Sequence, residues 1–178
     1  MTDTEIYNLA LVFRTAIESA RDAGKLKNDI SFHHFPRGCC GDACYLLAEF
    51  LYRHRIETIW TSMERDGSHA WLVLKDWRIK EPTPSSYTWP EEMWSTLKKY
   101  GVENPEKTIV TTHYEDDDLK NGLIIDITAD QFPDYDIPVY VGTMDSFHRK
   151  YDFIQAHDFR GMGTGRLEGL YRKIEKWI

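Results

Sequence analysis

The chain has no excess of basic charge and no long apolar run. Its 22 Lys and Arg against 29 Asp and Glu leave a net charge of −7, which argues against the basic surface that nucleic-acid binding requires. No apolar segment approaches the roughly 20 residues that span a bilayer. The acidic, amphipathic N-terminus also lacks the basic start and apolar centre of a signal peptide. We therefore expect a cytoplasmic protein without nucleic-acid or membrane partners, and the sequence leaves the oligomeric state open.

Cysteine is scarce, and all of it lies in one place. The three cysteines are Cys39, Cys40 and Cys44, an odd number with two adjacent, which does not form a credible disulfide framework. In a reducing compartment, clustered thiols are typical of catalysis or of metal binding instead.

Repeats and low-complexity segments are also lacking. The 178 residues, of which 42% are hydrophobic and 29% charged, have the length and composition of one domain with a sizeable core. We therefore treat residues 1–178 as a single domain.

Hydrophobic periodicity and turn residues divide the chain into helices followed mainly by strands. Helices are predicted at 4–23, 40–54, 88–101 and 166–178, and strands at 56–63, 69–75, 123–128 and 137–142. The stretch "YEDDDLKNG", residues 114–122, is interpreted as an exposed acidic turn, and "RGMGTGR", residues 160–166, as a flexible joint. This order predicts an α+β fold in which N-terminal helices pack on an antiparallel sheet.

The predicted helix at 40–54 begins at a thiol. Unpaired N–H groups and the positive end of the dipole at a helix N-terminus stabilise a thiolate, and Arg37 adds positive charge nearby. Cys40 is therefore the best-placed nucleophile. Cys39 in the preceding loop ranks second, and Cys44, one turn into the helix beside its buried stripe, ranks third.

A thiol nucleophile needs a base and usually a group that orients the base. His69 begins a predicted strand, and Asp126 interrupts the apolar strand "LIIDIT", where an unpaired carboxylate is costly. If the two strands are neighbours, Asp126 accepts a hydrogen bond from the ring of His69. Asp130 is a rival for that third position.

Three motifs in this order resemble a known family. The sequence "GCCGDAC" opens a helix, "HAWLVL" starts a strand, and "IDIT" lies on the following strand. This arrangement is similar to the transglutaminase-like branch of the papain-like cysteine protease superfamily, over about residues 36–130. The resemblance implies a papain-like fold with Cys40 as nucleophile, His69 as base and Asp126 as orienting acid.

The resemblance also implies an activity. Cys40 would attack an amide of a protein or peptide substrate and form a thioester, without any cofactor, and we favour hydrolysis as the outcome. The separation of His69 and Asp126 is 126 − 69 = 57 residues, longer than is usual in the family. Residues 76–121 are therefore interpreted as an insertion that serves as a lid or as a substrate-recognition arm.

Three other functions stay open at this point. Resolution of the thioester by an amine would make the protein a cross-linking transglutaminase. A displaced or blocked Cys40 would leave a catalytically inactive papain-like binding module. A structural zinc site is the third, with candidate ligands His33, His34, Cys39, Cys40 and Cys44.

Overall fold

A computed structural model describes residues 2–65, 67–162 and 165–178 of the chain. Its α-helices are α1 (Asp3–Asp22), α2 (Cys40–Arg53), α3 (Trp94–Lys99), α4 (Asp116–Asn121) and α5 (Arg166–Ile174). Its strands are β1 (Thr58–Glu64), β2 (Ser68–Leu74), β3 (Thr83–Tyr87), β4 (Ile109–His113), β5 (Ile124–Asp126), β6 (Tyr140–Gly142) and β7 (Asp152–Asp158). Short 3₁₀ turns are η1 (Phe32–His34), η2 (Glu91–Met93), η3 (Ala129–Gln131), η4 (His148–Lys150) and η5 (Glu175–Trp177).

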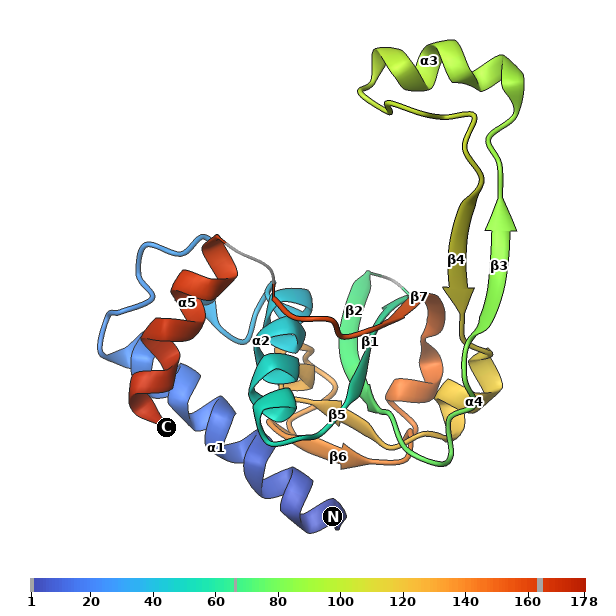
Figure 1. Ribbon diagram of the computed structural model, residues 1–178. Coiled ribbons are helices and arrows are strands. Elements are labelled where there is room, and N and C mark those ends of the chain that lie inside the picture. Colours follow the sequence, from blue (N-terminus) through green and yellow to red (C-terminus); the bar gives the residue numbers. More distant parts are fainter. Residues whose placement is uncertain (1, 66, 163–164) are drawn as a thin grey trace.

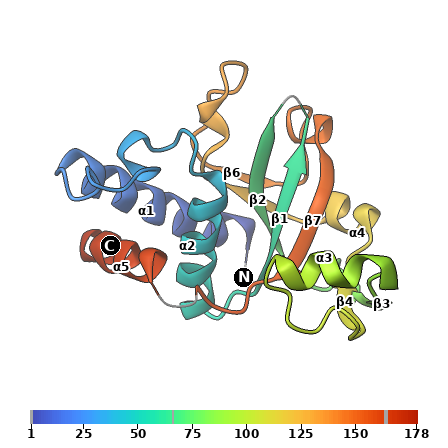
Figure 2. The ribbon, with the colours of Figure 1, turned by 90° about the horizontal axis from the view of Figure 1, so that it is seen from above.

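The body of the molecule is a five-stranded antiparallel sheet with helices on one side. The strand order is β6-β5-β2-β1-β7, and α1, α2 and α5 lie together on one side of it (Figures 1 and 2). The predicted α+β class is confirmed. The neighbouring positions of β2 and β5 are also confirmed, with Leu72 opposite Ile125.

Apolar side chains cover both faces of the sheet because alternate residues of a strand point to opposite faces. On β2, Ala70 and Leu72 pack against the helices, whereas Trp71 and Val73 join a second core on the other face. That second core includes Phe147 and other side chains from the loops after β5 and β6. The helical core uses the predicted stripe of α2, made of Ala43, Leu46, Leu47, Phe50 and Leu51.

A buried arginine fastens α1 to the loops that follow β5. Arg14 is 4% exposed, and its guanidinium makes two hydrogen bonds to Asp130, of 2.8 and 2.7 Å. It also donates to the carbonyl oxygens of Ile127 and Pro138, both at 2.7 Å. Five donors in a rigid fork suit such a multiple contact, so the position of α1 depends on this side chain.

A two-stranded arm projects from the body. Strands β3 and β4 pair with each other and carry α3 at their far end (Figure 1), within the segment 76–121 that the sequence marked as an insertion. No residue of β3 or α3 is buried. At the base, Asp158 of β7 accepts hydrogen bonds from Lys75 at 2.9 Å and from Tyr114 at 2.6 Å.

Several elements differ from the sequence predictions. The acidic stretch 114–122 is not a turn, because Asp116–Asn121 forms helix α4 with Leu119 buried beneath it. Strands β3, β4 and β7 had not been anticipated. Residues 163–164 of the predicted joint "RGMGTGR" lie outside the described residues. In the described part of the chain, no helix has the length and apolar character needed to cross a bilayer.

Removal of the Arg14 guanidinium should weaken the fold strongly. Arg14→Ala leaves Asp130 and two carbonyl oxygens without their donor, and breaking such a buried pair costs about 3–5 kcal/mol. Urea unfolding measures this loss. Arg172→Ala is the matched control, since the Arg172 side chain is 70% exposed and its pair with Glu168 should be worth less than about 1 kcal/mol. Equal losses for the two variants would contradict the anchoring role of Arg14.

Candidate functional site

Cys40 is the first residue of α2 and the most accessible of the three thiols. Cys39 is 2% exposed and Cys44 is 3% exposed, whereas Cys40 is only partly buried. The preceding Gly38 has a φ of 69°, a left-handed conformation that glycine adopts without strain. The loop therefore turns sharply into the helix, and Cys40 lies beside the unpaired N–H groups of its first turn.

His69 lies at the start of β2 and reaches Asp126 at the end of β5. The ring is 1% exposed, and its Nε2 is 2.7 Å from Oδ2 of Asp126. The predicted contact between the two side chains is therefore present. Because Nε2–H donates to the carboxylate, the neutral ring offers Nδ1 as an acceptor. Cys40 lies close enough to the same ring to raise its pKa.

The carboxylate of Asp126 is buried and has four donors. Oδ1 accepts from the backbone N–H of Thr128 at 2.8 Å and from its hydroxyl at 3.2 Å. Oδ2 accepts from His69 and from Nε2 of His148, the latter at 3.3 Å. With so many donors, a buried carboxylate stays ionised.

Charge coupling favours a protonated His69 next to an ionised Asp126. Burial alone would lower the pKa of His69, but Asp126 and Cys40 together raise it to about 9. Burial likewise disfavours the charged form of Asp126, yet His69 and His148 hold the pKa of this carboxyl well below its usual range. The site therefore stabilises an imidazolium beside Cys40.

Asp130, the rival for the third position, is engaged elsewhere. Both of its carboxylate oxygens accept from Arg14, so this side chain points toward α1. The geometry brings Cys40, His69 and Asp126 together and places Asp130 in the anchor of that helix.

Gln131 is a polar residue of the site that sequence reasoning missed. Its Oε1 accepts from the backbone N–H of Gly38 at 3.2 Å, and its Nε2 donates to the Thr128 carbonyl at 3.0 Å. The same Nε2 lies 3.4 Å from Nδ1 of His69. Gln131 thus joins the loop before Cys40 to the histidine. No pattern in the sequence marked it, apart from its place shortly after "IDIT".

His148 and Asp145 were also missed. His148 is fully buried beside Asp126, and its Nδ1 lies 2.7 Å from Oδ1 of Asp145. Asp145 and His148 lie in an irregular segment without a helix or strand repeat, so hydrophobic periodicity could not indicate them.

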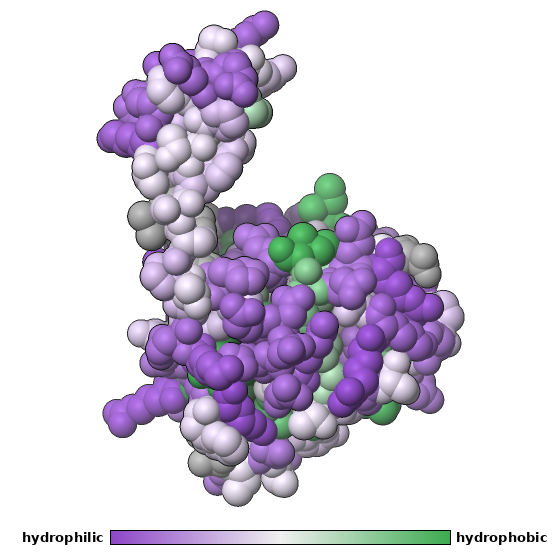
Figure 3. Space-filling model, turned by 90° about the vertical axis from the view of Figure 1, so that its right-hand side faces the viewer, coloured by the Kyte–Doolittle hydropathy of each residue, from purple (hydrophilic) through white to green (hydrophobic). Residues whose placement is uncertain are grey.

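Two hollows lie near this site. One, of about 650 Å³, is lined by Arg21, His33, His34, Phe35, Arg37 and Gly38, and so adjoins the loop that precedes Cys40. A groove of about 670 Å³ follows the outer edge of β7 at the base of the arm. Figure 3 shows a strip of apolar side chains on this otherwise hydrophilic side of the molecule.

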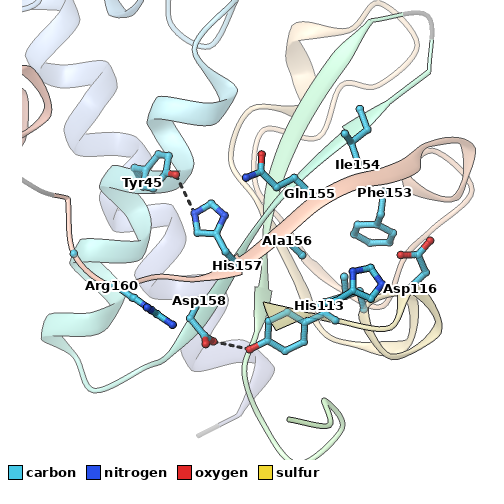
Figure 4. Close-up of a pocket in the computed structure, with 13 residues that line it drawn as sticks. Tyr45, His113, Asp116, Phe153, Ile154, Gln155, Ala156, His157, Asp158 and Arg160 are labelled. Carbon is cyan, nitrogen blue, oxygen red and sulfur yellow. Dashed lines mark hydrogen bonds between the residues drawn. The ribbon is translucent and has the colours of Figure 1, made fainter. Parts of the chain in front are cut away.

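Aromatic contacts connect the β7 groove to Gly41, the residue that follows Cys40 in α2. Tyr45 and His157 point toward each other in Figure 4, with the Tyr45 hydroxyl 3.0 Å from Nε2 of His157. Trp60 packs on both rings, and its indole N–H donates to the Gly41 carbonyl at 3.3 Å. The two sites are neighbours, but Cys40 does not line the groove.

The metal hypothesis gains no support from the arrangement of the side chains. Within residues 2–65, 67–162 and 165–178, no group of three or more His, Cys, Asp or Glu could hold a metal ion. The rings of His33 and His34 instead lie against each other, with centroids 3.8 Å apart.

Comparison with known proteins found no similar protein. The chain matches no protein-family model, no curated protein and no solved structure. The functional argument therefore depends on the chemistry of the residues themselves.

Cys40 should be the thiol that reacts in the folded protein. Burial raises the pKa of Cys39 to about 12 and that of Cys44 well above its usual value, so neither should label at neutral pH. Mass spectrometry after brief iodoacetamide treatment should find one modified position, Cys40. Cys40→Ala should abolish native labelling and change the free energy of unfolding by no more than about 1 kcal/mol. Labelling of Cys39 or Cys44 at a comparable rate would contradict this assignment.

Proposed function

We propose that this protein is a thiol-dependent hydrolase of amide bonds, with Cys40 as nucleophile, His69 as base and acid, and Asp126 as the group that orients His69. The observation that carries the proposal is the position of the His69 ring, with Nε2 2.7 Å from Oδ2 of Asp126 and close enough to Cys40 for that thiol to raise the pKa of the ring. A buried imidazole between a carboxylate and a thiol at a helix N-terminus is the arrangement that activates a cysteine.

Acylation would proceed in two steps. The thiolate of Cys40 attacks the carbonyl carbon of the substrate amide, and the carbonyl electron pair moves to oxygen. The N–H of Cys40 at the helix start supplies one donor to that oxyanion. When the tetrahedral intermediate collapses, the C–N bond breaks, His69 gives its Nδ1 proton to the leaving amine, and a thioester remains on Cys40.

Deacylation would use the same histidine as a base. Neutral His69 takes a proton from water, the hydroxyl oxygen attacks the thioester carbon, and the C–S bond breaks. The products are a carboxylic acid and the Cys40 thiol, so no cofactor is consumed. Asp126 holds Nε2–H throughout and keeps Nδ1 directed at the reacting atoms.

The papain-like, transglutaminase-like fold is part of this proposal. It is supported by a helix that begins at the nucleophile, by the histidine and aspartate on adjacent antiparallel strands, and by their order along the chain. The arm of β3 and β4 would serve in substrate recognition, since it stands beside the groove along β7. A protein or peptide is the substrate class that best suits such an arm.

The charge of His69 should control how Cys40 reacts with an anionic reagent. A thiolate beside an imidazolium attracts iodoacetate, and this advantage over neutral iodoacetamide disappears when the ring loses its proton. Since the pKa of His69 is raised to about 9, the ratio of the two alkylation rates should be high at pH 7 and should fall as the pH rises through about 9.

His69→Gln is the control for that profile. It should remove the fall near pH 9 and slow labelling at pH 7 roughly tenfold, because an unassisted thiol is only a few per cent ionised there. A wild-type ratio that is independent of pH would refute the Cys40–His69 pair. With an active amide substrate in hand, mass spectrometry of the product then identifies water or an added amine as the acceptor.

Substitutions of Asp126 and Asp130 should show that the first residue is functional and the second structural. Asp126→Asn leaves a side chain that can present N–H to His69 and favour the wrong tautomer, so amide hydrolysis should fall by about 10³-fold or more. Labelling at pH 7 should fall no further than it does in His69→Gln. Asp130→Asn should weaken the fold through Arg14 but leave the rate of the folded protein within about twofold. Rates are measured well below the midpoint of thermal unfolding of each variant. The opposite pattern would transfer the orienting role to Asp130.

A further inference from the structure

A second histidine stands behind the orienting carboxylate. His148 of η4 is fully buried, and its Nε2 is 3.3 Å from Oδ2 of Asp126, the oxygen that His69 also contacts. On its other side, Nδ1 is 2.7 Å from Oδ1 of Asp145. The four side chains form a row in the order His69, Asp126, His148, Asp145.

Asp145 at the end of the row is fixed as an anion. Its Oδ1 accepts from the backbone N–H groups of Phe147 at 2.9 Å and His148 at 3.0 Å, and its Oδ2 accepts from the Tyr135 hydroxyl at 2.9 Å. Although burial opposes ionisation, these donors and His148 hold the pKa of Asp145 below its usual range.

The two carboxylates beside the His148 ring favour its protonated form. Each ring nitrogen faces a carboxylate oxygen, and a neutral imidazole has only one N–H. The imidazolium alone donates to both Asp126 and Asp145. The ring is held in place by Tyr140, stacked at 4.8 Å between centroids, and by the edge contact of Trp71 at 5.0 Å.

We propose that His148 is a positioning residue which, as a fixed cation, shares the charge of Asp126 and limits how tightly Asp126 holds the proton on His69. This inference deepens the proposed function and rests on it, because the reaction requires His69 to alternate between its charged and neutral forms. His148 touches neither substrate nor Cys40 in this scheme and acts only through Asp126.

The electrostatic reason is the balance of charge along this row, in which His69, Asp126 and His148 are buried and Asp145 is partly exposed. A carboxylate without the second cation would hold His69 as a permanent imidazolium, and such a ring could not accept a proton from water in deacylation. A like charge on the far side of Asp126 disfavours the imidazolium of His69. The other ionisable groups against His148 are the phenols of Tyr135 and Tyr140, and burial raises the pKa of both, so they stay neutral.

The first test needs no variant at His148. Long-range ¹H–¹⁵N spectra of the imidazole rings, recorded at pH 7 on the full-length protein, distinguish a protonated from an unprotonated ring nitrogen. Both nitrogens of His148 should carry protons. One unprotonated nitrogen on His148 would overturn the proposal.

The second test follows the titration of His69 by the same spectra in a Cys40→Ala background. Adding His148→Gln keeps an N–H for Asp126 but removes the cation, so the pH midpoint of His69 should rise by about one unit. His54→Gln is the matched control, because His54 lies at the other end of α2 with its Nδ1 2.8 Å from the Phe50 carbonyl. That change should leave the midpoint where it was. An unmoved midpoint in folded His148→Gln protein would overturn the proposal.

These outcomes are separate from those that test the proposed function. The titration is read in protein that lacks the Cys40 thiol, so it does not depend on thiol reactivity. An inert wild-type Cys40 together with a shifted His69 midpoint would refute the hydrolase and support the role of His148. If His148→Gln does not fold, the wild-type spectrum of the His148 ring decides by itself.

Discussion

The ionised carboxylate of Asp126 is the constraint on which much of this structure depends. It is 1% exposed, and a charge removed from water in this way is tolerated only when donors replace the lost hydration. Its donors come from three separate segments: His69 on β2, Thr128 in the turn after β5, and His148 in η4. These segments must therefore be fixed relative to one another before the charge can be buried.

The polar side chains of the 3₁₀ turn η3, which follows Thr128, point in different directions. After Thr128, Asp130 points toward Arg14 of α1, while Gln131 reaches His69 and the backbone N–H of Gly38. One 3₁₀ turn thus connects the first helix, the loop that leads into Cys40, and the imidazole. Because these contacts join segments that are far apart in the chain, the positions of Cys40 and His69 are set by tertiary structure rather than by either loop alone.

Much of this could be predicted from local patterns, and the rest could not. The apolar stripe of α2 and the runs of strand-forming residues in β1 and β2 act over short distances, so the sequence located these elements. The order of the motifs also predicted the contact between His69 and Asp126. Strand β7 went unrecognised because an edge strand is only partly buried and shows weak alternation. Asp126 and Asp130 could not be told apart from sequence, since Arg14, which lies 116 residues from Asp130, is what separates them. The acidic run formed a helix because Leu119 is buried, a tertiary effect.

The net charge of the four side chains in this row would influence the stability of the reactive form, in which a Cys40 thiolate lies beside a protonated His69. In the thiol form, with His69 neutral, the row holds two carboxylates and the imidazolium that we infer at His148, a net charge of −1. Transfer of the Cys40 proton to His69 adds a second cation and brings the net charge of the row to zero. If His148 were uncharged, the net charge of the row in the thiol form would be −2. His69 would then hold the proton from Cys40 too firmly. The proposed cation therefore weakens the hold of the row on the proton that His69 receives from Cys40. Proton transfer stays reversible, as a histidine that serves as both base and acid requires.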